Sequence, residues 1–271
     1  MDYYGDGSTL PVISFIIPAH DEEASIVATV EAIVASASGH DFEVIVVGDA
    51  CTDQTVALAE AAGAKVVTVA LRQIAGARNA GAAAARGDLF VFVDADTRIT
   101  QAVVADVLEA VANGAVGGGA MVRFDRPMPV WARLVVPVIT RAYLAMKLAA
   151  GCFVFATRDA FDGVGGFDLK LFAGEELEFS QSVKRYAKSA SRSHEQKACF
   201  VIVRSYVETS ARKLRTHSGF RMLSQLLRIV FLGRRGLSGR KHLSFWYGPR
   251  VQDPLSRNDG GAPSDSGPSS R

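Results

Sequence analysis

Two aspartates, Asp94 and Asp96, follow an apolar segment at residues 89–93 and are separated by one residue. If this segment is a strand that continues, its two-residue period turns both carboxylates to the same side. Carboxylate oxygens suit Mg²⁺ or Mn²⁺, and such an ion can bridge to a diphosphate. The alternative is a polar turn in which an aspartate caps the next helix. The fully apolar segment in front of the pair favours the metal site.

Acidic residues also follow two earlier apolar segments. The sequence PAHDEE occupies residues 18–23, and VGDACTD occupies residues 47–53. The acids of the first sequence either serve a ligand or match the positive end of a helix dipole. In the second sequence, Asp49 is either an acceptor for an N–H group of a nucleobase or a turn residue.

A basic residue and a second acidic pair complete the candidates. Arg78 lies in the small-residue segment 74–86, where close backbone approach is allowed and a guanidinium can bind a phosphate in bidentate fashion. The alternative is a solvated arginine on an alanine-rich helix. Glu175 and Glu176 begin a helix after Gly174, and either could be a general base whose pKa is set by burial. Composition alone favours ordinary acids at a helix N-terminus.

Strand-like and helix-like segments alternate through the first 125 residues. We expect strands at 12–17, where Pro18 ends the strand, and at 42–47, 65–69, 89–93 and 119–124, and helices at 26–37, 52–62, 74–86 and 100–113. Thr52 is a suitable N-cap for the second helix and Gly63 a suitable residue to end it. Such apolar strands, separated by helices, predict an α/β fold with a mostly parallel sheet covered on both faces. These sheets bind ligands beyond the carboxyl ends of their strands.

The second half of the chain is less regular. We expect an apolar helix at 130–150 broken by Pro137, strands at 153–156 and 200–203, a GVGGFD loop at 163–168, and helices at 177–187 and 220–232. The Gly-, Pro- and Ser-rich sequence from about residue 252 predicts a disordered tail.

Composition excludes several classes of protein. The 271 residues are 49% hydrophobic with a net charge of +2, which suits one large α/β domain and argues against nucleic-acid binding. Three widely spaced cysteines without a CxxC pair argue against structural zinc and suit a reducing compartment. There is no signal-peptide core, no long apolar run, and no GxGxxG or Walker sequence. We therefore expect a cytoplasmic protein, with membrane contact left open.

Taken in order, IIPAHDEE, GARNAG, FVDAD and GGFD followed by an acidic pair resemble the family 2 glycosyltransferases, an inverting group with the GT-A fold. The resemblance runs from about residue 12 to 214, and VETSARKLR at its end resembles a bacterial subgroup. It implies a catalytic domain at 1–215, with a nucleotide-binding half at about 10–125 and an acceptor half at about 126–215. A C-terminal apolar and basic helical extension at 216–251 and a disordered tail at 252–271 would follow.

The resemblance also implies a role for each matching position. Pro18, Ala19 and Glu22 would line the nucleoside pocket, Asp49 would contact the base, and Arg78 would lie near the diphosphate. Asp96, with Asp94 nearby, would hold Mg²⁺ or Mn²⁺, and His217 would be a further metal ligand. Gly151, Gly165 and Gly166 would face the donor sugar or the acceptor. Glu176 would be the catalytic base, with Glu175 as its helper.

Three departures from the family pattern bear on these roles. Gly48–Asp49 replaces the usual pair of aspartates and Ala50–Cys51 replaces Gly–Ser, which leaves the base of the donor open. Glu175–Glu176 replaces the usual Glu–Asp, so either glutamate could be the base. The Gln-x-x-Arg-Trp sequence of processive synthases is missing, which favours a single transfer.

The implied activity is hexosyl transfer with inversion from a nucleotide-diphosphate sugar, first of all a UDP-sugar, to an acceptor hydroxyl. The segment 220–232, flanked by arginines, is too short to span a bilayer. It could lie on an anionic membrane near a lipid-linked acceptor, or pack on the catalytic domain. The rival hypothesis is an inactive nucleotide-sugar-binding or scaffold protein. A nucleotidyltransferase is disfavoured because the acidic PAHDEE sequence would repel a triphosphate.

Overall fold

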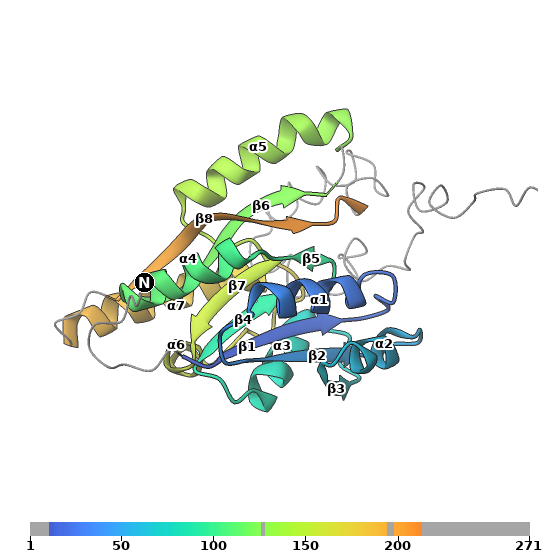
Figure 1. The fold of residues 1–271 in the computed structure, drawn as a ribbon. Helices are drawn as coiled ribbons and strands as arrows, with labels where there is room; N and C mark the ends of the chain where they lie inside the picture. The colour runs from blue at the N-terminus through green and yellow to red at the C-terminus, as the bar shows by residue number, and fades with distance from the viewer. Residues whose placement is uncertain (1–10, 126–127, 194–197, 213–271) are drawn as a thin grey trace, which may run out of the picture.

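The computed structural model describes residues 11–125, 128–193 and 198–212, which form a mostly parallel sheet covered by helices (Figure 1). The strands are β1 (Ile13–Ala19), β2 (Phe42–Asp49), β3 (Lys65–Val69), β4 (Leu89–Val93), β5 (Thr97–Arg98), β6 (Ala115–Phe124), β7 (Phe153–Thr157) and β8 (Cys199–Thr209). The helices are α1 (Ile26–Ser36), α2 (Thr55–Ala61), α3 (Ile74–Ala84), α4 (Gln101–Ala112), α5 (Val130–Ala145), α6 (Arg158–Val164) and α7 (Glu175–Ser193).

The sheet has the strand order β3-β2-β1-β4-β7-β6-β8-β5. Strands β3, β2, β1 and β4 are parallel, as are β6 and β8. Strand β7 is antiparallel to both β4 and β6, and the short β5 is antiparallel to β8. The predicted α/β class with a mostly parallel sheet is confirmed. Because β7 is antiparallel to β4, its first residues lie beside the carboxyl end of β4, where the aspartate pair follows.

Helices cover both faces of the sheet, as the apolar strands predicted. In β4, Leu89, Val91 and Val93 belong to one buried cluster, which also holds side chains of α1 and α4. Phe90 and Phe92 belong to the cluster on the other face, with side chains of α3, α6 and α7. This arrangement explains why β4 has no polar side chain: neither of its faces meets water.

The small residues of α3 let this helix approach the sheet closely. An added Cβ at Gly81 would lie 2.3 Å from a methyl group of Ile16 in β1 and 2.9 Å from one of Val47 in β2. Any side chain at this position would therefore force α3 away from the sheet. Because α3 lies this close to the sheet, the position of Arg78, one turn earlier on the helix, is fixed relative to the strands.

Several boundaries in the first half differ from the predictions. Strand β6 begins at Ala115 rather than at residue 119, and β2 ends at Asp49 rather than at residue 47. Strand β1 continues through Pro18 to Ala19. Its pairing with β4 ends at Ile16, so Pro18 lies where only β2 is a neighbour and a missing N–H is tolerated. Helix α2 begins at Thr55, so the prediction that Thr52 caps it was wrong. The backbone N–H of Thr52 instead donates to Asp21, at 2.7 Å.

The second half also departs from the expected boundaries. Gly163 and Val164 belong to α6 rather than to a loop; the Thr157 hydroxyl caps this helix and Gly165, at φ +78°, ends it. Pro137 lies inside α5 without ending it. Strand β8 runs six residues past the predicted end, to Thr209, because β6 and β5 both pair with it. None of the described helices is long and apolar enough to cross a bilayer. The predicted extension at 216–251, the tail at 252–271 and His217 lie outside the described residues.

Candidate active site

Arg78 is the centre of the candidate site and is 1% exposed. Its Nη1 donates to Oε1 of Glu175 at 2.8 Å. Its Nη2 donates to the carbonyl oxygen of Gly151 at 2.7 Å and to Oδ1 of Asp94 at 3.2 Å. The guanidinium carbon lies 5.1 Å from the ring centre of Phe167. The structure thus brings three predicted site residues to Arg78. Asp94 follows β4, Glu175 begins α7, and Gly151 lies in the turn before β7.

The charge of Arg78 is secured by these partners. Burial lowers the pKa of the guanidinium, but the carboxylates of Glu175 and Asp94 outweigh this and raise it above its usual value. Its Nε is buried and has no hydrogen-bond partner among the described residues. The position of Arg78 near a diphosphate remains a prediction; its contacts here are with protein groups, so its solvated alternative is wrong.

Glu175 and Glu176 have different surroundings although they are adjacent. Glu175 is 4% exposed and held by Arg78. Glu176 is partly exposed and lies against Gly151, where an added Cβ would be 3.4 Å from the carboxyl carbon of Glu176. Burial, and then the charge of Glu175, raise the pKa of Glu176 to about 8, against a lowering by Arg78. Of the two, Glu176 can therefore take up and release a proton near neutral pH.

Two further side chains near these carboxylates were not anticipated from the sequence. Burial and then Glu176 raise the pKa of Tyr143, in the last turns of α5. Burial and then Asp94 raise the pKa of the Cys152 thiol, whose backbone carbonyl accepts the N–H of Asp94 at 3.1 Å. Both groups therefore stay neutral. Their residue types gave no signal in the sequence, because their roles depend on neighbours far along the chain.

The aspartate pair after β4 offers hard oxygen ligands. The Asp94 side chain is 23% exposed and the Asp96 side chain 9% exposed. Each lies beside one arginine: Asp94 beside Arg78, and Asp96 beside Arg212 with its Oδ2 3.7 Å from Nη2. This donor set fits Mg²⁺ or Mn²⁺ with further oxygens supplied by a substrate. No third His, Cys, Asp or Glu of the described residues joins the pair at metal-ligand spacing.

Arg212, just beyond β8, is the residue of this region that the sequence did not single out. Its Nη2 lies 3.1 and 3.0 Å from the two carboxylate oxygens of Glu22, 190 positions earlier in the chain. Glu22 is therefore paired with a cation beside Asp96, at the edge of the predicted nucleoside pocket. The only hint was the VETSARKLR resemblance, because an isolated arginine after a strand has no distinctive spacing.

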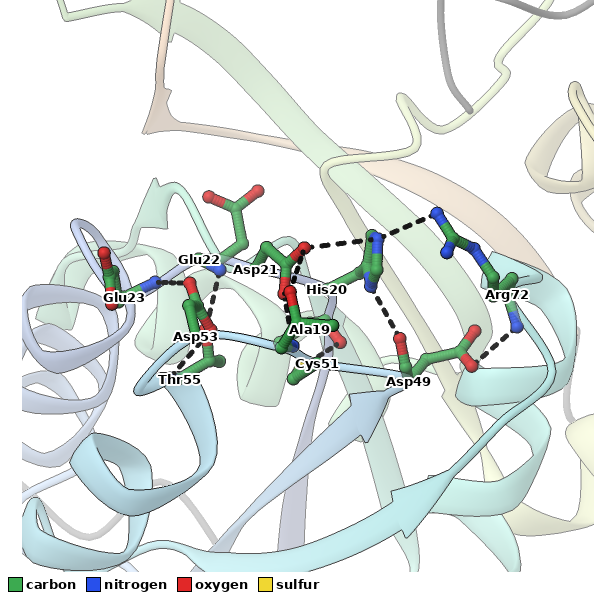
Figure 2. Close-up of polar contacts among 11 residues, drawn as sticks. Ala19, His20, Asp21, Glu22, Glu23, Asp49, Cys51, Asp53, Thr55 and Arg72 are labelled. Carbon is green, nitrogen blue, oxygen red and sulfur yellow. Dashed lines mark hydrogen bonds and ion pairs between the residues drawn. The ribbon is translucent and has the colours of Figure 1, made fainter. Parts of the chain in front are cut away.

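Asp49 holds the segment that leads into α3. Its Oδ1 accepts the backbone N–H groups of Leu71 and Arg72, at 2.7 and 2.6 Å, and its Oδ2 accepts that of Gln73, at 2.7 Å. The Nδ1 of His20 lies 2.8 Å from the carbonyl oxygen of Asp49, so that nitrogen carries the proton (Figure 2). Contact between Asp49 and a base stays a prediction; the described contacts of its carboxylate hold the backbone of residues 71–73.

The two acidic loops after β1 and β2 are tied together (Figure 2). Asp21, at φ +51°, binds the N–H of Thr52, while Asp53 accepts the N–H groups of Glu23 at 3.1 Å and Thr55 at 2.9 Å. With Cys51, these two aspartates form a group whose ligand atoms lie within 4.8 Å of one another. Burial and then Asp53 raise the pKa of Cys51, so its thiol stays protonated. The cluster therefore serves first as a clasp between loops.

The predicted glycine loop is fixed to α3. Gly165 and Gly166 have φ values of +78° and +73°, and an added Cβ at Gly166 would lie 2.8 Å from Oδ1 of Asn79. Asn79 exchanges two hydrogen bonds of 2.9 Å with the backbone of Phe167. This places the Phe167 ring against Arg78. The glycines thus supply a turn that positions Phe167, and their contact with a sugar or acceptor stays a prediction.

The mostly parallel α/β sheet with helices on both faces matches the fold of GT-A glycosyltransferases. A sequence profile described as "Glycosyl transferase family 2" matches residues 14–167, more than half of the chain. The chain belongs to glycosyltransferase family 2, and it is a glycosyltransferase. A comparison with curated proteins finds no match.

Solved structures of low sequence identity share the fold. Mannosyltransferase PcManGT from Pyrobaculum calidifontis, in complex with GDP-Man and Mn²⁺, is 17% identical with a TM-score of 0.61, over 97% of this chain and 68% of that one. Glucosyl-3-phosphoglycerate synthase from Mycobacterium tuberculosis, in complex with Mn²⁺, UDP and glucosyl-3-phosphoglycerate, is 19% identical with a TM-score of 0.51, over 88% of each chain. S. aureus TarS 1–349 is 16% identical with a TM-score of 0.54; the match covers 82% of this chain and 65% of that one.

Proposed function

We propose that the protein is an inverting, metal-dependent glycosyltransferase that moves a sugar from a nucleoside-diphosphate donor to an acceptor hydroxyl. The observation that carries the proposal is the buried Arg78, which gathers Asp94, Gly151 and Glu175 beside a glutamate, Glu176, with a pKa of about 8. Membership of family 2 supports it, as do two structural relatives that were solved in complex with Mn²⁺ and GDP-Man or with Mn²⁺ and UDP. A UDP-sugar is the first donor to test.

Glu176 is the general base of the proposed reaction. Its partly exposed carboxylate accepts the proton of the acceptor hydroxyl while that oxygen attacks the anomeric carbon. The bond to the diphosphate breaks on the opposite side, so one displacement inverts the configuration. Glu175 is held by Arg78, and its charge makes Glu176 more basic. This is how Glu175 helps.

Asp94 and Asp96 would hold Mg²⁺ or Mn²⁺, which when bound supplies positive charge to the diphosphate leaving group. The protein's own part is to fix the two carboxylates. Asp94 is bound by Arg78 through its side chain, and its backbone N–H donates to Cys152. The backbone carbonyl of Asp96 accepts the N–H of Ser210 at 3.2 Å. Carboxylates fixed in this way lose little freedom when they bind a ligand.

The acceptor of this proposal is presented at an anionic lipid surface, which α5 contacts. Val130, Leu134 and Val138, four residues apart on one side of α5, are 76%, 73% and 67% exposed. The helix contains no acidic residue, and the side chains of Arg133 and Arg141 are exposed. An apolar stripe with cationic flanks suits the interface of an anionic membrane. The residues after α5 lead directly to Gly151 beside Glu176, and the earlier candidate at 220–232 lies outside the described residues.

The rival function is a nucleotide-sugar-binding protein without catalysis. The elevated pKa of Glu176 argues for chemistry, because a binding protein has no need of a carboxyl that exchanges protons near pH 8. Hydrolysis or transfer of donor separates the two. A protein that binds a donor with Mn²⁺ but never consumes it, with varied acceptors, would be the binding protein.

A thermal-shift screen of UDP-, GDP-, CDP- and dTDP-sugars, each with and without Mn²⁺, tests the proposed donor class. A ligand that binds the native state raises the melting temperature by mass action. We expect one nucleotide series to raise it only with Mn²⁺. The anomeric configuration of the product, read by NMR, then tests inversion. If no nucleotide-sugar stabilises the protein with or without metal, the proposed function fails.

A further inference from the structure

Arg212 occupies the space between two acidic residues of the proposed donor site. Its Nη2 lies 3.0 Å from Oε2 of Glu22 and 3.7 Å from Oδ2 of Asp96. The side chains of Glu22 and Asp96 are 8% and 9% exposed, whereas that of Arg212 is 22% exposed. In Figure 2 the carboxylate of Glu22 points away from the loop network around Asp21 and Asp53. The guanidinium is thus the member of this group that a ligand reaches first.

The backbone around Arg212 is anchored without its side chain. The N–H of Ser210 donates to the Asp96 carbonyl at 3.2 Å, and that of Ala211 donates to Asp125 at 2.8 Å. Ala211 is fully buried and packs in a small apolar cluster with Ala132 of α5. A structural tie between the end of β8 and the loop after β4 therefore exists already. The Arg212 side chain, which contacts Glu22 and Asp96, is not needed for this backbone tie.

The charges around Arg212 indicate which ligand its side chain would bind. One guanidinium faces two carboxylates, so a divalent cation at Asp96 would be repelled by Arg212 at a distance where Coulomb forces are strong. A diphosphate would attract the same guanidinium, because arginine binds phosphate oxygens with paired N–H groups. Metal and diphosphate arriving together thus favour movement of Arg212 off Asp96 and onto the diphosphate.

We propose that Arg212 is a ligand of the donor diphosphate that shields Asp96 until metal and donor bind. This inference rests on the proposed function, because it takes Asp96 as a metal ligand and a nucleoside diphosphate as the donor group. Arg212 then accounts for part of the coupling between binding of the metal and binding of the nucleoside diphosphate. Coupling of this kind is reciprocal: the factor by which UDP tightens Mn²⁺ binding equals the factor by which Mn²⁺ tightens UDP binding.

The test is to measure Mn²⁺ and UDP binding to Arg212→Met, each ligand alone and both together. Electron paramagnetic resonance reports free Mn²⁺, and calorimetry reports UDP. We expect Mn²⁺ alone to bind more tightly to Arg212→Met than to the wild type, because its competitor has gone. We expect UDP to bind more weakly, and the coupling factor to fall about fivefold or more. GDP is measured in parallel, so that the result does not depend on the base.

Two variants serve as controls. Arg86→Met removes an exposed arginine 3.0 Å from Asp41, at the amino end of β2 and so at the opposite end of the sheet. It should leave both affinities unchanged. Arg212→Lys keeps the charge without the paired N–H groups, so it should leave Mn²⁺ binding near the wild-type value while weakening UDP. If Arg212→Met does not fold, the lysine variant carries the test.

The direction of the change in Mn²⁺ affinity separates this role from a structural one. A purely structural Arg212 would position Asp96, so its loss would weaken binding of Mn²⁺ alone. That result, or an unchanged coupling factor, overturns the role of Arg212 and leaves the proposed function intact. A wild type that binds neither Mn²⁺ nor a nucleoside diphosphate would overturn the proposed function as well.

Discussion

The ion pair between Arg78 and Glu175, at 2.8 Å, gives two adjacent glutamates different surroundings. Both members of the pair are buried, and Glu175 is committed to the guanidinium. Glu176, next to this fixed negative charge and partly buried, has the elevated pKa. The two glutamates therefore differ because of their positions on α7, since their side chains are chemically the same.

Arg78→Met should be strongly destabilising. Removal of the guanidinium leaves Glu175 as a buried charge without its partner, which typically costs about 3–5 kcal/mol. Urea unfolding measures the loss, and Arg86→Met, in an exposed pair that typically contributes about 0–1 kcal/mol, is the control. Arg78→Lys should be intermediate, because one ammonium cannot reproduce the fork that reaches Glu175, Gly151 and Asp94. A methionine variant as stable as the control would show that Arg78 does not hold the site together.

Glu176→Gln should lose turnover by about 10²–10⁴-fold while it keeps its affinity for the donor, because a base acts in the transition state. In the wild type, kcat/KM should rise with pH through the pKa of about 8, since the ionised form is the base. Steady-state kinetics across pH tests both statements. Glu175→Gln serves as the comparison: if that variant is inactive and Glu176→Gln is not, the base is the other glutamate.

The same pKa predicts how stability depends on pH. The pKa of Glu176 is raised in the folded protein, to about 8 from its usual 4.5, so the folded state binds this proton more tightly than the unfolded state. The contribution of Glu176 to stability therefore falls as pH rises from about 4.5 to 8. Glu176→Gln has no such proton, so its melting temperature should rise relative to that of the wild type as pH increases across this range. A difference in melting temperature between variant and wild type that stays constant with pH would contradict the raised pKa.

Asp96→Ala should abolish Mn²⁺ binding and turnover while the fold remains intact. The comparison variant is Asp53→Asn, in the cluster of Asp21, Cys51 and Asp53 after β1 and β2. Because those carboxylates already accept backbone N–H groups, we expect Asp53→Asn to keep its Mn²⁺. Calorimetry with Mn²⁺ decides between the two places. Full activity of Asp96→Ala in the presence of a chelator would remove the metal from the mechanism.

Much of the sheet could be predicted because its strands are apolar runs with clear ends. The bounds of β3 and β4 agree with the predictions, and β4 is apolar because both of its faces are covered. Helix α6 was missed because seven residues directly after strand β7 carry too little periodicity. The start of α2 was misplaced because Asp53, rather than Thr52, accepts the first N–H of the helix. That choice depends on Asp21, which binds Thr52 from another loop.

The candidate site was predictable in part, for a related reason. Asp94 could be picked from its position after a strand, Glu175 from its position at the start of a helix, and Arg78 from its small-residue helix. Their mutual contacts could not be predicted. The pairing of Arg212 with Glu22 joins residues 190 positions apart, and no local pattern encodes such a distance. The raised pKa of Glu176 likewise depends on burial and on neighbours that only the folded chain provides.

Contact of α5 with an anionic lipid surface should depend on its exposed apolar stripe. The double variant Leu134→Glu/Val138→Glu places two carboxylates on this face, which an anionic surface repels and a lipid interface disfavours. Val34→Glu is the control, because Val34 is 45% exposed on α1, away from the stripe. Flotation with vesicles that contain phosphatidylserine, at low and high salt, measures the contact.

We expect the wild type and Val34→Glu to float with anionic vesicles at low salt and to be released as salt rises, since Arg133 and Arg141 supply part of the attraction. The double variant should remain with the soluble fraction. If the wild type does not float, α5 does not contact lipid. If it sediments as a dimer that the double variant dissociates, the stripe is an interface between two copies of the chain. If the double variant floats like the wild type, another part of the chain contacts the membrane, and α5 has no role in presenting the acceptor.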